Sequence, residues 1–243
     1  MNPLYISASG MIAQNQNLAL IAGNVANSQS PGYLAQTGTF IAYPVGTVIR
    51  TGNTPGVLGQ SSSGVAFTAG LNVAGGGVQS TSNPNDLAIM GNNGFFIVRT
   101  PQGLAYTRNG QFSVDAQGHL VTNQGYFVLG QNGKPIQLKT GVAFSVSPQG
   151  VITQGATVVG TLGLADLPLT GVMKALGQDI YSSPTRTPFT GKVVQSSLNT
   201  SNVNLEGSMA QMIDAQTWYQ SLTQVVNEES TRLSTAATLG MLA

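Results

Sequence analysis

The sequence has no cysteine and a single histidine among its 243 residues. No disulfide, thiolate nucleophile or zinc–thiolate site can therefore form, and one imidazole excludes most transition-metal sites. Charged residues are also scarce, at 7% of the chain against about 25% in an ordinary globular protein. With a net charge of +1 the chain offers no basic surface for nucleic acid and has little electrostatic protection against self-association.

Long apolar runs are missing as well. No stretch of 18 apolar residues occurs, so we expect no helix that spans a membrane. No lysine or arginine precedes Arg50, and a secretory signal peptide needs a basic segment before an unbroken apolar one. If the protein leaves the cytoplasm, we expect it to do so without a cleaved signal peptide.

Residues 3–27 show the alternating spacing of three and four that is typical of a helix packed against another helix. Gly10 and Gly23 lie within this stretch, and Ser30-Pro31-Gly32 ends it. Asn15 fills the one polar gap in the apolar seam, which consists of Leu4, Ala8, Met11, Leu18, Ala22 and Val25.

Residues 201–239 show the same period. We expect Ser201 or Asn202 to cap this helix and Glu206 to lie in its first turn, where the helix dipole favours a carboxylate. A helix of this length spans roughly 50 Å and needs a partner, so the two end helices are predicted to pair as in a coiled coil. The seam consists of Leu205, Met209, Met212, Tyr219, Val226 and Leu233, with Gln216, Thr223 and Ser230 between them.

The middle of the chain changes to short runs with a period of two, broken by Gly, Pro and Asn. Asn109-Gly110, Gln117-Gly118 and Asn132-Gly133 are typical of tight turns. The predicted fold class is therefore α+β: a helical domain from residues 1–35 and 200–243, an extended connector over 36–77, and a central all-β domain of short antiparallel strands over 78–199. The predicted strands include 95–98, 105–107, 111–114, 126–129, 142–147, 151–153 and a run over 157–167.

Residues that could carry chemistry are few. His119 and Asp115 could form a general base, but a lone histidine beside a predicted turn is better interpreted as a hairpin residue. The glycines 75–77 lack the Lys-Ser/Thr that a phosphate-binding loop needs, and Trp218-Tyr219 is interpreted as helix-pair core. We predict no catalytic residue, no metal and no cofactor, and hence no enzyme.

Three segments resemble the flagellar basal-body rod and hook family. The first runs from Ser9-Gly10-Met11 through residues 21–27 to Ser30-Pro31-Gly32-Tyr33, and the third covers residues 198–203 and 212–219. The second and most specific is an ordered string in the middle of the chain. It contains Asn83-Pro84-Asn85-Asp86-Leu87-Ala88-Ile89, Gly94-Phe95-Phe96, Tyr106-Thr107-Arg108-Asn109-Gly110, Phe112, Asp115, Gly118, Leu120-Val121-Thr122 and Gly125-Tyr126.

The chain departs from the family pattern at three positions. The family usually has a basic residue where Leu34 stands, an acidic residue where Asn199 stands and an arginine where Thr217 stands. Any ion pair that the family makes at these positions is absent from this chain, so contacts there are expected to be more apolar and less sensitive to salt.

The resemblance implies a non-enzymatic rod subunit that polymerises through its terminal helices, transmits torque and encloses an export channel. It implies copies of itself and neighbouring rod and hook proteins as partners, export through the flagellar type III apparatus, and a place in the periplasmic rod. The length leaves no room for the outer domain of a hook protein, and Tyr43-Pro44-Val45-Gly46 favours the proximal rod type over the distal type. An adhesin-like β protein and an enzyme acting on cell-wall polymer are the rival hypotheses. The predicted assembly interface consists of Leu4, Met11, Leu18, Val25, Tyr33, Leu205, Met212, Tyr219, Val226 and Leu233.

Overall fold

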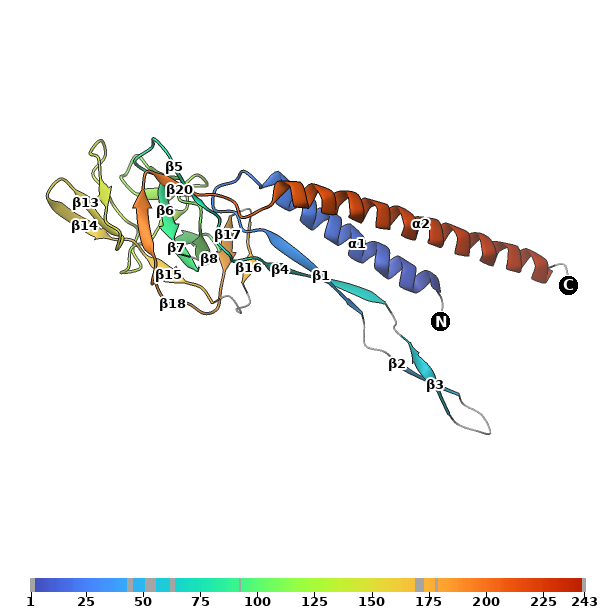
Figure 1. Ribbon diagram of the computed structural model, residues 1–243. Coiled ribbons are helices and arrows are strands. Elements are labelled where there is room, and N and C mark those ends of the chain that lie inside the picture. The colour runs from blue at the N-terminus through green and yellow to red at the C-terminus, as the bar shows by residue number, and fades with distance from the viewer. Residues whose placement is uncertain are drawn as a thin grey trace. The chain divides into compact units, whose positions relative to one another are not determined.

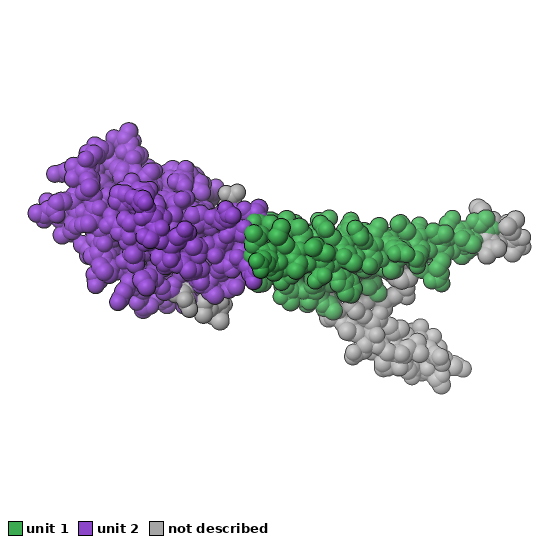
Figure 2. Space-filling model, turned by 45° about the horizontal axis from the view of Figure 1, so that its top comes forward, with its two compact units in different colours: residues 1–25, 36–70, 205–243 green, residues 26–35, 71–204 purple. Residues whose placement is uncertain are grey.

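The computed structural model describes residues 3–42, 46–50, 56–61, 64–91, 93–168, 173–177 and 179–241 (Figure 1). For residues 3–5, 46–50, 56–61 and 239–241 the backbone alone is described. The chain divides into two compact units, coloured separately in Figure 2. Unit 1 contains residues 1–25, 36–70 and 205–243, and unit 2 contains residues 26–35 and 71–204.

Unit 1 contains two helices, α1 (Pro3–Ala26) and α2 (Leu205–Met241). They lie side by side with opposite chain directions (Figure 1). Their 24 and 37 residues correspond to lengths of roughly 36 Å and 55 Å. The predicted helices at the two ends of the chain are thus confirmed, and Glu206 lies in the first turn of α2 as expected. The start of α2 was predicted too early, because Ser201 and Asn202 make their hydrogen bonds in unit 2 and Asn204 precedes the first helical residue.

The predicted connector contributes strands to unit 1. β1 (Gln36–Ala42) pairs with β4 (Val65–Leu71), and β2 (Gly46–Arg50) forms an antiparallel ladder with β3 (Gly56–Ser61). Phe40 and Phe67 face each other across the first pair, with ring centroids 5.4 Å apart at 64°. Residues 43–45, which favoured the proximal rod type, lie outside the described residues.

Unit 2 is built of short strands, and the pairs whose register the structure gives are antiparallel. The largest sheet runs in the order β16-β17-β8-β7-β11-β10-β9, and β15 joins β7 to β18. Its strands are β7 (Gly94–Thr100), β8 (Gly103–Thr107), β9 (Phe112–Val114), β10 (Leu120–Thr122), β11 (Phe127–Val128), β15 (Leu164–Asp166), β16 (Lys174–Ala175), β17 (Ile180–Ser182) and β18 (Thr187–Pro188).

Three smaller ladders complete unit 2. One is a three-stranded sheet in the order β12-β13-β14, and the other two are pairs, β19 with β6 and β20 with β5. The last two join segments that lie more than 100 residues apart in the sequence. Their strands are β5 (Val78–Ser80), β6 (Leu87–Met90), β12 (Ser145–Val146), β13 (Val151–Gln154), β14 (Thr157–Thr161), β19 (Lys192–Gln195) and β20 (Ser197–Asn199).

The core of unit 2 has two clusters, one on each face of β7. Successive side chains of a strand point to opposite faces, so Phe95 and Phe96 enter different clusters. Phe96 meets Phe112 edge to face, with centroids 5.0 Å apart, and Phe95 meets Tyr181 at 6.0 Å. Burying a side chain of this size contributes about 1.5–3 kcal/mol, which makes β7 the centre of the domain.

Two of the three predicted tight turns are confirmed by positive φ angles, 88° at Gly118 and 73° at Gly133. The third predicted turn, at Asn109-Gly110, does not form a hairpin, because β8 and β9 belong to one sheet but are not neighbours in it. Asn109 and Gly110 instead form a crossing loop. Gly110 is needed there because a Cβ atom would lie 1.6 Å from the carbonyl oxygen of Leu87.

We predict that Gly110→Ala lowers the free energy of unfolding of unit 2 by about 2–4 kcal/mol, since the obstacle is a backbone carbonyl in a packed core. The matched control is Gly160→Ala, where a Cβ would meet nothing within 4 Å. Urea unfolding of both variants measures the difference. Equal stability of the two variants would contradict the close approach at Gly110.

Candidate assembly interface

One face of α2 is partly covered within unit 1. Its least exposed side chains follow each other at alternating spacings of four and three, as predicted for a heptad pattern. Three predicted seam residues, Met212, Tyr219 and Val226, lie on this stripe. The residues alternating with them were predicted at 209, 216 and 223, but the stripe has 208, 215 and 222, each one residue earlier. The stripe consists of Ser208, Met212, Ala215, Tyr219, Leu222 and Val226.

The face of α1 toward α2 includes a polar side chain and a glycine. The Nε2 atom of Gln14 donates a 3.0 Å hydrogen bond to the carbonyl oxygen of Ala215, and a Cβ at Gly10 would lie 3.6 Å from Leu222. Asn24 is also buried, and its amide binds both the N–H and the carbonyl of Gln36 at 2.8 and 2.7 Å. Buried amides are tolerated where their hydrogen bonds are made, so polar side chains can serve as the inner face.

The predicted apolar seam of α1 is rotated by one residue, about 100°, from this inner face. Met11, Leu18 and Val25 are half-buried, and the contacts between the helices use Gly10 and Gln14 instead. Ile12 lies further out, with 63% of its surface exposed. Among the described side chains of α1, the most buried apolar ones are Ala13 and Ile21, which are not members of the predicted seam.

The other predicted interface residues differ in exposure. Leu205 and Leu233 are exposed on α2, while Met212, Tyr219 and Val226 are half-buried. Leu4 lies in α1, but its side chain is outside the described part of the chain. Tyr33 is buried inside unit 2 and packs within its own chain.

A cleft of about 700 Å³ opens in unit 1 between α1, β1, β4 and α2. Trp218 lines it and is 67% exposed, so the interpretation of this residue as helix-pair core was wrong. Phe40 also lines it and is exposed. The remaining lining residues are Gly10, Gln14, Asn17, Leu20, Ile21, Gln36, Thr37, Gly38, Val65, Gln211, Asp214, Ala215 and Leu222.

The three positions that depart from the family pattern have uncharged roles. Leu34 is buried in the second core cluster, and its N–H donates a 3.0 Å hydrogen bond to the hydroxyl oxygen of Tyr181. Asn199 is buried, and its amide binds both the N–H and the carbonyl of Ile89 at 2.9 Å. Thr217 is exposed on α2 and bonds back to the carbonyl of Ile213.

Asn202 fastens three chain segments at the edge of unit 2. Its Oδ1 accepts a 2.6 Å bond from the N–H of Ala35, and its Nδ2 donates to the carbonyls of Asn72 and Ala74 at 2.7 and 2.6 Å. The three segments are those that lead toward the residues of unit 1. This role could not be predicted from the sequence, because it depends on contacts more than 120 residues apart.

Arg108 is another residue whose role the sequence does not reveal. It is buried, it donates to the carbonyl of Gly91, and its guanidinium lies 5.8 Å from the centroid of the Phe95 ring. Burial lowers the pKa of Arg108, while Tyr181 and Asp166 act in the opposite direction. A Cβ at Gly75 would lie 2.6 Å from this guanidinium, which explains the first of the glycines 75–77 without any phosphate.

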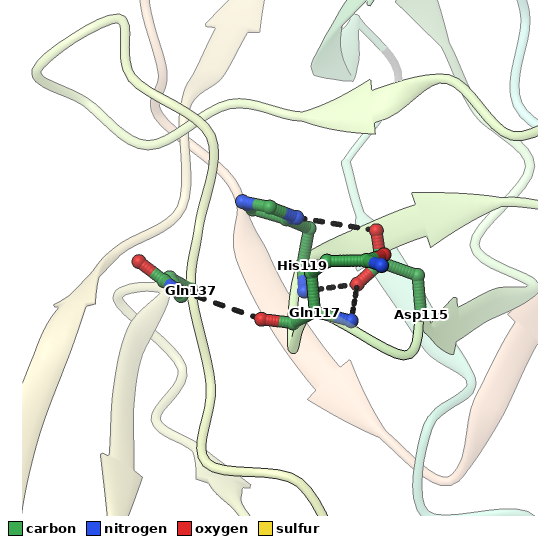
Figure 3. A network of polar contacts seen from close by, with 4 residues as sticks. All are labelled: Asp115, Gln117, His119 and Gln137. Carbon is green, nitrogen blue, oxygen red and sulfur yellow. Dashed lines mark hydrogen bonds and ion pairs between the residues drawn. The ribbon is translucent and has the colours of Figure 1, made fainter.

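The Asp115–His119 pair closes the turn between β9 and β10 (Figure 3). One carboxylate oxygen accepts bonds from the N–H groups of Gln117 and His119, and the other lies 3.1 Å from Nδ1 of His119. The His119 ring packs on Phe127, and Gln137 bonds to the backbone of Gln117. Each Asp115 contact stabilises the turn, which agrees with the interpretation of His119 as a hairpin residue.

Within the described residues, no helix is long and apolar enough to cross a membrane, and no group of three or more acidic or histidine side chains could hold a metal. The described features are a helix pair with exposed apolar faces, an open apolar cleft and a β domain whose polar groups serve its own structure. This combination is that of a structural protein.

Comparison with known proteins identifies the family. Residues 88–154 match the flagellar hook protein FlgE/F/G D1 domain, and residues 194–239 match the flagellar basal body rod FlgEFG protein C-terminal domain. The chain is 31% identical to the flagellar basal-body rod protein FlgG of Buchnera aphidicola subsp. Baizongia pistaciae, covering 92% of this chain and 94% of that protein. It is 30% identical to FlgF of Rhizobium meliloti, with 98% and 97% covered.

The chain belongs to the flagellar basal-body rod protein family. FlgG of Bacillus subtilis is also similar, at 29% identity over 93% of this chain and 94% of that protein. These relatives are structural rod proteins, which confirms the predicted family and the prediction that the chain is not an enzyme. Relatives of both the FlgF and the FlgG type match at similar identity, so the proximal position stays a prediction.

We predict that Asn199→Asp destabilises unit 2 by about 2–4 kcal/mol at neutral pH, because a buried carboxylate would face the carbonyl of Ile89 and lose the donor of the amide. The loss should shrink in acid, where a protonated carboxyl regains an O–H donor. Thermal unfolding between pH 7 and pH 4 tests this, with Asn132→Asp in an exposed turn as control. A loss that is independent of pH would refute the explanation.

A second prediction concerns the Asp115 turn. Burial raises the pKa of Asp115, but the bonds from His119 and Gln117 and the attraction of the His119 ring outweigh it, so the pKa is lowered overall. The stabilisation is therefore fully present above about pH 5 and is lost as the pH falls through the lowered pKa. The stability of the protein minus that of Asp115→Asn should decline over this acid range. Parallel curves for the two proteins would exclude a charge contribution.

Proposed function

We propose that this rod protein is an axial subunit that polymerises through its terminal helices, transmits torque and encloses an export channel. The observation that carries the proposal is the exposed apolar surface of α1 and α2 in a chain with only 7% charged residues. Large apolar side chains left in water on neighbouring helices mark a surface that is covered in use. Little charge on these helices means little repulsion between copies.

The arrangement of the seams supports contacts between copies. Met11, Leu18 and Val25 are only half-buried, and Leu205 and Leu233 are exposed. In the proposal these side chains form coiled-coil-like contacts with neighbouring subunits. Residues 1–35 and 200–243 would form the assembly domain, 36–77 the connector, and 78–199 the β domain that contacts neighbours laterally.

The proposed partners are copies of this chain and the adjacent rod and hook proteins. The family supports the proposed export through the flagellar type III apparatus, without a cleaved signal peptide. The proposed place is the rod in the periplasmic space, in the proximal rod type, with the distal type as the alternative.

Deletion of the gene should abolish motility and leave basal bodies without complete rods in electron micrographs. We expect the unaltered gene to restore both. Ile12→Ser should restore them poorly, whereas Val158→Ser in unit 2 should restore them fully, although both side chains are 63% exposed. Normal rods in the deletion strain would refute the proposed function, and equal complementation would refute the role of the helices.

Limited proteolysis separates a rod subunit from an adhesin-like β protein. If the helices are completed by neighbouring copies, a monomer should be trimmed at both ends, leaving a resistant fragment of about residues 77–200. Mass spectrometry identifies the fragment. Ends that resist protease as well as unit 2 does would favour the adhesin-like alternative.

A further inference from the structure

The first part of α2 carries an exposed apolar ridge. Leu205, Met209 and Ile213 follow each other at intervals of four residues, so they lie in one row along the helix. Their exposed fractions are 38%, 53% and 65%. We call this row the ridge.

The cleft lies on the other side of the same helix. Gln211, Ala215, Trp218 and Leu222 are the residues of α2 that line it, together with Asp214. At about 100° per residue, the centre of this set is about 200° around the helix from the centre of the ridge. A ridge and a cleft on opposite faces of one rigid helix cannot meet within one molecule, so any contact between them joins two molecules.

The chemistry of the two surfaces is matched. The ridge has no charged member, and among the described residues that line the cleft only Asp214 is ionisable. An apolar row can therefore enter the cleft without leaving a set of charges desolvated and unpaired. Trp218 and Phe40 supply the cleft with exposed aromatic surface of the kind enriched at the centre of protein interfaces.

The size of the surfaces argues against a closed pair. The exposed parts of Trp218 and Phe40 amount to about 200–300 Å² from the usual area of aromatic side chains, and the ridge is of similar size. One such contact falls far below the roughly 1,200 Å² of a stable interface, so it is weak alone. In such a contact one copy uses its ridge and the other uses its cleft, so each copy keeps one surface free for a further copy. Repeating the contact therefore gives an open chain of copies.

We propose that the cleft of one copy receives the ridge of α2 from a second copy, in a head-to-tail contact that repeats along the assembly. The inference rests on the proposed function of an axial subunit and names the partner surface of its helical domain. Ile213 is the main anchor of the ridge because it is the most exposed of the three, and Trp218 of the copy that receives the ridge forms the wall against which it packs.

Trp218 is the single tryptophan of the chain and therefore reports directly on the cleft. With rising protein concentration we expect its fluorescence to shift to the blue and to lose sensitivity to acrylamide. Ile213→Ser removes the anchor of the ridge, and Thr37→Arg places a long charged side chain in the cleft; each variant alone should lose the effect. Val158→Ser, in unit 2, should retain it. An unchanged effect in either of the first two variants overturns the proposal.

A mixing experiment distinguishes head-to-tail contact from a symmetric one. Copies with Ile213→Ser keep the cleft, and copies with Thr37→Arg and Trp218→Phe keep the ridge but emit no tryptophan light. When the two are mixed, Trp218 of the first should shift to the blue, because its cleft is filled by the ridge of the second. A mixture that behaves as the sum of its parts overturns the proposal.

Cysteine cross-linking captures the contact even if it is weak, since the chain has no cysteine of its own. Met209→Cys copies mixed with Thr37→Cys copies under mild oxidation should give mainly the mixed disulfide dimer. A predominance of disulfide dimers between two Met209→Cys copies would show a symmetric contact and overturn the proposal. Failure of these three experiments together with normal complementation in the deletion strain would leave the rod function standing and remove only this contact.

Discussion

The structure depends on satisfying buried backbone groups with uncharged partners. Every N–H and carbonyl that leaves water needs a hydrogen bond, and this chain has few ionised side chains to supply one. Amides do so instead: Asn24 pairs with both backbone groups of Gln36, and Asn199 with both of Ile89. Asn202 binds three separate backbone groups. A carboxylate has no N–H or O–H donor, so at each of these positions it could accept a bond from the backbone N–H but could not donate one to the carbonyl.

The same constraint explains which features of the helices could be predicted. Apolar spacing gives the existence and approximate length of α1 and α2, because a period near 3.6 is a property of the local sequence. It does not give the rotation of α1 about its axis. Gln14 lies on the inner face, and its burial is favourable only when its distant partner Ala215 on α2 is in place. A pattern of apolar residues assigns such side chains to the outside.

In unit 2, the strand positions and two of the turns follow from alternation and glycine, but the order of strands does not. The neighbours β8 and β9 in sequence are separated in the sheet, and β6 pairs with β19 more than 100 residues later. The cleft was equally beyond prediction, because its lining comes from four elements of unit 1. Trp218 was assigned to the core since spacing shows which residues share a face, not whether anything covers it.

The pairing of β5 with β20 and of β6 with β19 has a consequence for how the chain matures. These ladders, and the bonds of Asn202, join the first third of unit 2 to its last residues. Contacts so distant in sequence close late, after the loop entropy of the intervening residues has been overcome. Until about residue 202 is available, the edge of the β domain stays open. In the proposed export through the type III apparatus, the β domain would therefore complete its fold only after nearly the whole chain has passed.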